Sequence, residues 1–118
     1  MPAPVLDPAV IETLRQLTPP GEPDVLNEVL GLFLEDVPVR IARLREAWQS
    51  GDAAAVQRAA HSLKGSAGNI GATAMLAVCK QLDEHGHAGD LSGLPPLVAS
   101  LDAEYGRVEA EIQRLIKP

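Results

Sequence analysis

Hydrophobic residues recur every three or four positions along most of this chain, which is the spacing of one face of an α-helix. The longest such stretch covers about residues 24–50, and Pro38 within it should bend the helix without ending it, because the apolar pattern continues in phase. Its apolar positions are Leu26, Leu30, Phe33, Leu34, Val37, Ile41, Leu44 and Trp48. The alternating pattern of a β-strand is absent, so the chain is expected to be helical.

Turn and capping residues divide the periodic pattern into separate helices. Asp7 and Asp52 are expected to cap the first and third helices, and Thr73 the fourth. Gly51 and Gly71 are expected to end helices, and residues 85–93 to form a turn-rich stretch. The predicted helices span residues 8–17, 24–50, 52–70, 73–85 and 95–116.

Four long helices joined by short loops predict an all-α fold, an antiparallel up-and-down four-helix bundle with a short additional N-terminal helix. The 118 residues are enough for one compact domain, which we expect to span residues 1–118. Aromatic residues make up only 3% of the chain while 46% of it is hydrophobic, so aliphatic side chains are expected to fill the core. Cys79 is expected to pack there as a small apolar residue.

The chain is acidic, with a formal net charge of −6, which argues against nucleic acid as a partner. Its single cysteine cannot form an internal disulfide, which is typical of a reducing compartment. Neither a signal sequence nor an apolar run long enough to span a membrane is present. The sequence therefore predicts a cytoplasmic protein without a membrane partner.

The predicted third helix places an unusual group of residues beside its buried face. Gln57, His61, Lys64, Gly65 and Gly68 fall within one sector of roughly 100°, counting 100° per residue. Gln57 and Lys64 lie four positions before and three after the histidine, the spacings at which helix side chains meet. Each glycine costs the helix about 1 kcal/mol relative to alanine. We interpret this surface as one that a partner protein must approach closely.

These residue types suit phosphoryl transfer. The neutral imidazole of His61 is a good nucleophile near pH 7. Its phosphorylated form carries about two negative charges, which the Lys64 ammonium can offset. The chain lacks both kinds of glycine-rich loop that cradle nucleotide phosphates, so we do not expect it to phosphorylate itself from ATP. Whether a carrier of this kind counts as an enzyme is left open.

The segment that follows His61 resembles the histidine-containing phosphotransfer (HPt) domains of two-component phosphorelays, whose pattern is H-x-[LI]-K-G-[SA]-[SA]-x-x-[LIF]-G-[AL]. The matching residues are His61, Leu63, Lys64, Gly65, Ser66, Ala67, Ile70, Gly71 and Ala72. The order of the predicted helices extends this resemblance over nearly the whole chain.

The resemblance implies that His61 accepts a phosphoryl group from the aspartate of one receiver domain and passes it to another. The expected partners are response-regulator receiver domains and a hybrid histidine kinase. The chain itself is expected to be a monomer that binds no cofactor or metal, with the Mg²⁺ supplied by the receiver. Gln57, Gly65 and Gly68 are expected at the docking surface. The resemblance places Asp83 next to the inner nitrogen of the histidine, and His87 as a basic residue one turn further on.

Several residues also allow other interpretations. Close helix packing is the alternative role for Gly65 and Gly68, although their place beside His61 favours access for a partner. His85 and His87 form a weak metal motif with His61. Phe33 and Leu34 are candidates for either the core or a docking patch. The cluster Arg40, Arg43, Arg45 and Glu46 is expected to form a solvated face. Two alternative functions are the phosphoacceptor domain of a chemotaxis-type histidine kinase and a helical adaptor that binds receivers without carrying phosphate.

Overall fold

The computed structural model describes residues 4–22 and 24–116, and all of the regular secondary structure in them is helical. The all-α prediction is therefore confirmed for this part of the chain, while residues 1–3, 23 and 117–118 of the predicted domain lie outside it. The helices are α1 (Pro8–Gln16), α2 (Val25–Gln49), α3 (Ala53–Asn69), α4 (Thr73–Ala88) and α5 (Leu94–Leu115).

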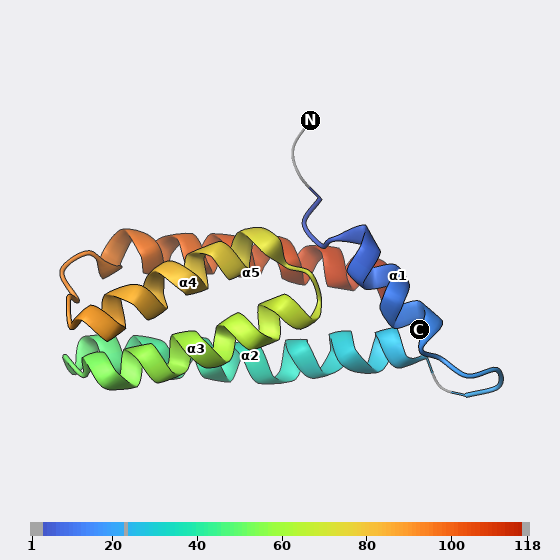
Figure 1. Ribbon diagram of the computed structural model, residues 1–118, viewed down its shortest axis with the longest axis horizontal. Coiled ribbons are helices and arrows are strands. Elements are labelled where there is room, and N and C mark those ends of the chain that lie inside the picture. Colours follow the sequence, from blue (N-terminus) through green and yellow to red (C-terminus); the bar gives the residue numbers. More distant parts are fainter. Residues whose placement is uncertain (1–3, 23, 117–118) are drawn as a thin grey trace.

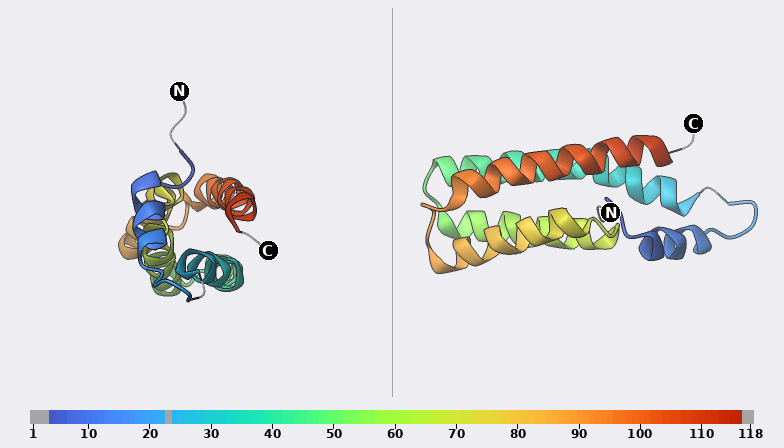
Figure 2. Two further views of the ribbon diagram at one scale, coloured as in Figure 1. Left: turned by 90° about the vertical axis from the view of Figure 1, so that its right-hand side faces the viewer. Right: turned by 90° about the horizontal axis from the view of Figure 1, so that it is seen from above.

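Helices α2 to α5 lie side by side, and consecutive helices run in alternate directions (Figure 1). Helix α3 packs against α2 and α4, and α5 packs against α4 and α2, so each of the four has two neighbours. The short helix α1 lies beyond the end of the α3–α4 pair and contacts α2 (Figure 2). None of the described helices is long and apolar enough to cross a membrane.

The apolar face of each helix forms a common core. In α3 the buried residues Val56, Ala60, Leu63 and Ala67 follow the predicted spacing. Cys79 is fully buried in α4, as predicted. No polar or charged side chain of the described residues is buried, so this core is held together by hydrophobic contacts alone.

Phe33 belongs to this core. Its side chain is buried and stacks on Tyr105 of α5, with ring centroids 6.2 Å apart. Leu34 is partly buried and packs against the same core. Helix α2 continues unbroken through Pro38, as the apolar pattern predicts. Two large apolar side chains in this part of α2 are exposed, Leu32 at 55% and Val39 at 50%.

Aspartates begin three of the helices. The side chains of Asp7, Asp24 and Asp52 each accept a hydrogen bond from a backbone N–H of the following turn, at 2.9, 2.9 and 3.0 Å. The predicted caps at Asp7 and Asp52 are therefore confirmed. The predicted cap at Thr73 is wrong, because Thr73 is already the first residue of α4 and the buried Ala72 precedes it.

Gly71 makes the tight turn between α3 and α4. Its φ of +71° is a conformation that favours glycine, and a Cβ atom here would lie 2.9 Å from Cβ of Asp7. The Asp7 N–H donates a hydrogen bond of 2.8 Å to the Gly71 carbonyl. The start of α1 is therefore fixed directly against the α3–α4 turn, and any side chain at position 71 would separate them.

The predicted end of α4 at residue 85 is wrong, because the helix continues to Ala88 and ends at Gly89, whose φ is +73°. Gly86 lies inside the helix and is buried. A Cβ on Gly86 would lie 2.8 Å from the Gln57 backbone nitrogen, so the glycine lets α4 approach the α3 backbone closely. This packing offsets the loss of helix stability that a glycine causes. Helix α4 therefore continues into the stretch that was predicted to form turns.

Candidate functional site

His61 lies on the surface of α3, one residue after the fully buried Ala60 and two before the fully buried Leu63. Its side chain is 76% exposed to solvent. The helix therefore holds the backbone of the histidine against the core and presents the imidazole ring outward. A partner can reach the ring without any rearrangement of the chain.

Asp83 of α4 faces the same histidine. Its Oδ2 atom lies 4.0 Å from Nδ1 of His61, which makes Nδ1 the inner nitrogen and leaves Nε2 on the other side of the ring. Asp83 therefore lies next to the inner nitrogen, where the resemblance places it, but the separation exceeds hydrogen-bond distance, so no direct hydrogen bond holds the ring. The aspartate side chain is short and its carboxylate is occupied elsewhere.

That carboxylate accepts a hydrogen bond of 2.7 Å from Nζ of Lys64. The Lys64 side chain is 28% exposed and that of Asp83 only 17%, so the pair is largely sheltered between α3 and α4. The hydrogen bond from Lys64, more than any other contact, holds the pKa of Asp83 below its ordinary value. Asp83 is therefore a carboxylate at neutral pH, and Lys64 is positioned by it one turn from His61.

Gln57 and His87 meet on the same side of the α3–α4 interface. Nε2 of Gln57 lies 3.3 Å from Nδ1 of His87, and a hydrogen bond from the Gln57 amide further lowers the pKa of Asp83. The basic residue expected one turn beyond Asp83 thus contacts Gln57. The structure thus places Gln57, His61 and Lys64 of α3 opposite Asp83 and His87 of α4.

Gly65 and Gly68 are exposed on α3. A Cβ atom built on either glycine would meet nothing within 4 Å. Neither glycine is therefore needed for packing within the described chain, which removes the alternative interpretation of these two positions. They leave a stretch of bare helix backbone beside His61, and their contact with a partner stays a prediction.

No group of three or more histidine, cysteine, aspartate or glutamate side chains in residues 4–22 and 24–116 is placed to hold a metal ion. The two other histidines have protein neighbours. Nδ1 of His85 lies 3.2 Å from the Asp90 carbonyl oxygen, at the end of α4, and His87 contacts Gln57.

Two features of the site were not predicted. One is the Lys64–Asp83 hydrogen bond, which joins residues on different helices. The other is the contact of Gly86 with the Gln57 backbone. A signal for the second was present in the sequence, because Gly86 follows Met75, Cys79 and Leu82 at helical spacing and so extends the buried face of α4.

Comparison with known proteins identifies this arrangement. Residues 28–116 match the family model of the Hpt domain. The chain belongs to the Hpt domain family. Two Arabidopsis thaliana relatives of this Hpt domain are histidine-containing phosphotransfer proteins 2 and 5, each 30% identical over 103 and 105 residues. These alignments cover 85% and 86% of this chain but only 66% and 67% of the plant proteins.

Solved structures have the same fold as this Hpt domain. The crystal structure of histidine-containing phosphotransfer protein B from Pseudomonas aeruginosa superposes with a TM-score of 0.89 at 31% identity, and covers 98% of this chain and 96% of its own. The HPT domain of a sensor hybrid histidine kinase from Shewanella superposes with a TM-score of 0.76 at 18% identity, covering 95% and 93%. The second similarity is one of fold.

Proposed function

We propose that this Hpt domain carries a phosphoryl group on Nε2 of His61 between the aspartates of two receiver domains. Histidine phosphotransfer in a two-component phosphorelay is the activity of its family. The observation that carries the assignment to one residue is the 76% exposure of His61, with the Asp83 carboxylate on its Nδ1 side and the Lys64 ammonium on that carboxylate.

The chemistry follows from this geometry. With the proton of the neutral ring on Nδ1, toward the Asp83 carboxylate, the lone pair of Nε2 is free to attack phosphorus. The N–P bond forms as the bond between phosphorus and the receiver aspartate oxygen breaks, and the aspartate leaves as a carboxylate. Positive charge develops on the ring during this step. The Asp83 oxygen, 4.0 Å from Nδ1, stabilises that charge.

Lys64 supports the phosphoryl oxygens in this proposal. It lies three positions after His61, so both side chains are on one side of α3. The ammonium is held by Asp83 before transfer and has two further N–H donors for a phosphoryl oxygen. A Mg²⁺ ion held by the receiver domain would offset the remaining negative charge.

The docking surface we propose consists of Gln57, Gly65 and Gly68 around His61. Both glycines are exposed, and a Cβ atom built on either would have no neighbour within 4 Å. A partner backbone or side chain can therefore approach the α3 backbone here. The proposed partners are response-regulator receiver domains and a hybrid histidine kinase. They would bind one copy of the domain, as a monomer in the cytoplasm, where the single cysteine stays reduced.

Helices α2 to α5 are interpreted as an antiparallel up-and-down four-helix bundle, with α1 as an additional N-terminal helix. The alternating helix directions in Figure 1 and the two neighbours of each long helix support this description. Such a bundle holds the α3 and α4 side chains of the site in fixed register.

Phosphate labelling tests the assignment. Incubated with a phosphorylated receiver domain, the protein should gain one phosphate per chain that is labile in acid and stable in base, as a phosphoramidate is. The variant His61→Gln should gain none. The variants His85→Gln and His87→Gln are matched controls that change the two other histidines, and both should still be labelled. Persistent labelling of His61→Gln would overturn the assignment.

A further inference from the structure

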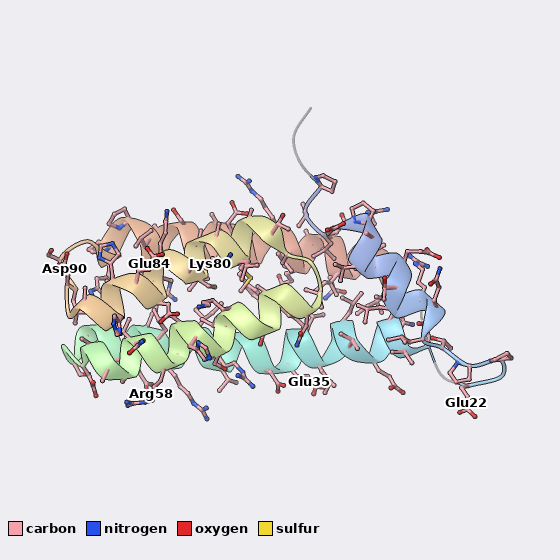
Figure 3. All side chains as sticks on the ribbon, in the orientation of Figure 1. Glu22, Glu35, Arg58, Lys80, Glu84 and Asp90 are labelled. Atoms are coloured by element: carbon pink, nitrogen blue, oxygen red, sulfur yellow. The ribbon has the colours of Figure 1, made fainter. Side chains whose placement is uncertain are left out.

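Three arginines surround a groove on the side of α3 that faces α2. Arg40 and Arg43 of α2 and Arg58 of α3 line it, together with Ala55, Ala59 and Ser62, around a volume of about 320 Å³. We call this the arginine groove. Figure 3 shows Arg58 pointing outward from α3, away from the core. No acidic residue lines this groove in the described part of the chain.

These three guanidinium groups are available to a partner. None of them has an ion pair or hydrogen bond within residues 4–22 and 24–116. Arg45, which was expected on the same solvated face, differs because it pairs with Asp102 of α5. Arg107 and Arg114 of α5 also have carboxylate partners, Glu104 and Glu111 respectively. In a chain of net charge −6, three unpaired arginines in one groove form a local positive field.

The groove borders the histidine and an apolar groove. Arg58 lies three positions before His61, and Ser62 directly follows His61. A protein that covers His61 therefore also covers this part of α3. Arg40 also lines a second groove of about 310 Å³, whose lining is mostly apolar (Val29, Leu32, Phe33, Val37 and Ile70) and includes one carboxylate, Asp36. An occupant that fills both grooves must have acidic and apolar groups side by side, which suits a protein segment better than a small anion.

We propose that the arginine groove binds an acidic segment of the receiver domain that docks over His61. The proposal rests on the proposed phosphotransfer function. The three guanidinium groups attract that segment during encounter and set the orientation in which the receiver aspartate meets Nε2 of His61. Arginine suits this role because its planar group binds a carboxylate through two parallel hydrogen bonds.

Binding of a receiver domain tests the proposal, with the receiver that binds the native, unphosphorylated protein most tightly as the probe. The triple variant Arg40→Gln/Arg43→Gln/Arg58→Gln is compared with the charge-matched control Lys80→Gln/Arg107→Gln/Arg114→Gln, which changes α4 and α5. At low salt the first should bind with a Kd about tenfold weaker, mainly through a slower association rate. Its affinity should also depend less on salt. The control should stay within about twofold of the native protein.

A second variant separates charge from fold. Arg40→Lys/Arg43→Lys/Arg58→Lys keeps the positive charges and should retain most of the association rate, while circular dichroism checks that all variants are helical. The proposal is overturned by an unchanged Kd in the glutamine variant, or by an equal loss in the control. Inorganic pyrophosphate serves as a probe for a small-anion site. The proposal is also overturned if the glutamine variant binds pyrophosphate more weakly but binds the receiver with an unchanged Kd. Because these readouts measure docking, a failure of His61 to accept phosphate would be seen separately.

Discussion

The surroundings of Lys64 fix the position of its ammonium group in the proposed mechanism. It does not extend freely into solvent but donates a hydrogen bond of 2.7 Å to Asp83. Its ammonium is thereby kept one helical turn from His61, on the side of α3 that faces α4.

Replacing Lys64 with alanine should slow phosphoryl transfer more than it weakens docking. The ammonium stabilises charge on the phosphoryl oxygens as the bonds change, so we expect the transfer rate to fall about tenfold, which corresponds to about 1.4 kcal/mol. The Kd for the receiver should change less than about twofold. Rapid-quench kinetics measures the first and surface plasmon resonance the second. Lys80→Ala, on the exposed side of α4, is the control; equal effects on rate and Kd would contradict this role.

The Lys64–Asp83 pair should also make stability depend on acid pH. The pKa of Asp83 is lowered in the folded protein, chiefly by the hydrogen bond from Lys64. The stabilisation from the Lys64–Asp83 pair is therefore complete above the pKa of aspartate in the unfolded chain, about 3.9. It is lost as pH falls through the lower pKa that Asp83 has in the folded protein. Urea unfolding should show Asp83→Asn to be less stable than the native protein by about 0.5–1 kcal/mol at pH 7, and the difference should shrink as pH falls into the acid range. A difference that grows toward acid pH would disprove the pairing.

At the scale of helices, Gly86 sets how closely α3 and α4 approach. Gly86→Ala would place a Cβ 2.8 Å from the Gln57 backbone nitrogen and 2.9 Å from its Cα, so one helix must shift. We expect a loss of about 1–3 kcal/mol in the free energy of unfolding. Gly106→Ala is the matched control within α5, where a Cβ meets nothing within 4 Å, and it should stabilise by about 0.5–1 kcal/mol. Urea denaturation compares the two, and equal effects would refute the close approach.

The same helices show what a sequence can predict. The caps at Asp7 and Asp52 were predictable because an N-cap depends on residues within one turn of it. The extension of α4 through Gly86 was not, because a glycine ends a helix or packs inside one according to the backbone it faces. Here that backbone belongs to Gln57, about thirty positions earlier.

The residues of the site also fall into those that the sequence predicts and those that only helix packing determines. The shared sector of His61, Lys64 and the glycines follows from the geometry of one helix and was found from the sequence. The partner of Lys64 depends on how α4 is rotated against α3. Asp83 lies beside the inner nitrogen of His61 as expected, at 4.0 Å, but its hydrogen bond comes from Lys64. Phe33 was ambiguous for a similar reason, because only the position of α5 shows that it stacks on Tyr105.

For the whole molecule, Cys79 reports when the core opens. It is the single cysteine of the chain and is fully buried in α4, and burial raises the pKa of its thiol to about 12. A thiol-specific reagent should therefore label the protein at pH 8 only as fast as the core opens. The labelling rate should rise with urea in step with the unfolding rate. Rapid labelling without denaturant would contradict a closed core.

The raised pKa also predicts a loss of stability in alkali. In the unfolded chain the thiol deprotonates near pH 9, whereas in the folded protein it keeps its proton until about pH 12. The free energy of unfolding should therefore fall as pH rises above 9, since the unfolded state releases a proton that the folded state retains. Cys79→Ala removes this contribution, so its own stability should decline less over the same interval.

The Lys64–Asp83 hydrogen bond has one further consequence, for the entropy of catalysis. A lysine side chain free in solvent loses up to about 2 kcal/mol of rotational freedom when it is fixed. Here most of that loss occurs when the protein folds, since the ammonium is already bound to Asp83. Under the proposed function, a phosphoryl oxygen would meet an ammonium that is already ordered by Asp83, so little further side-chain entropy would be lost in each transfer.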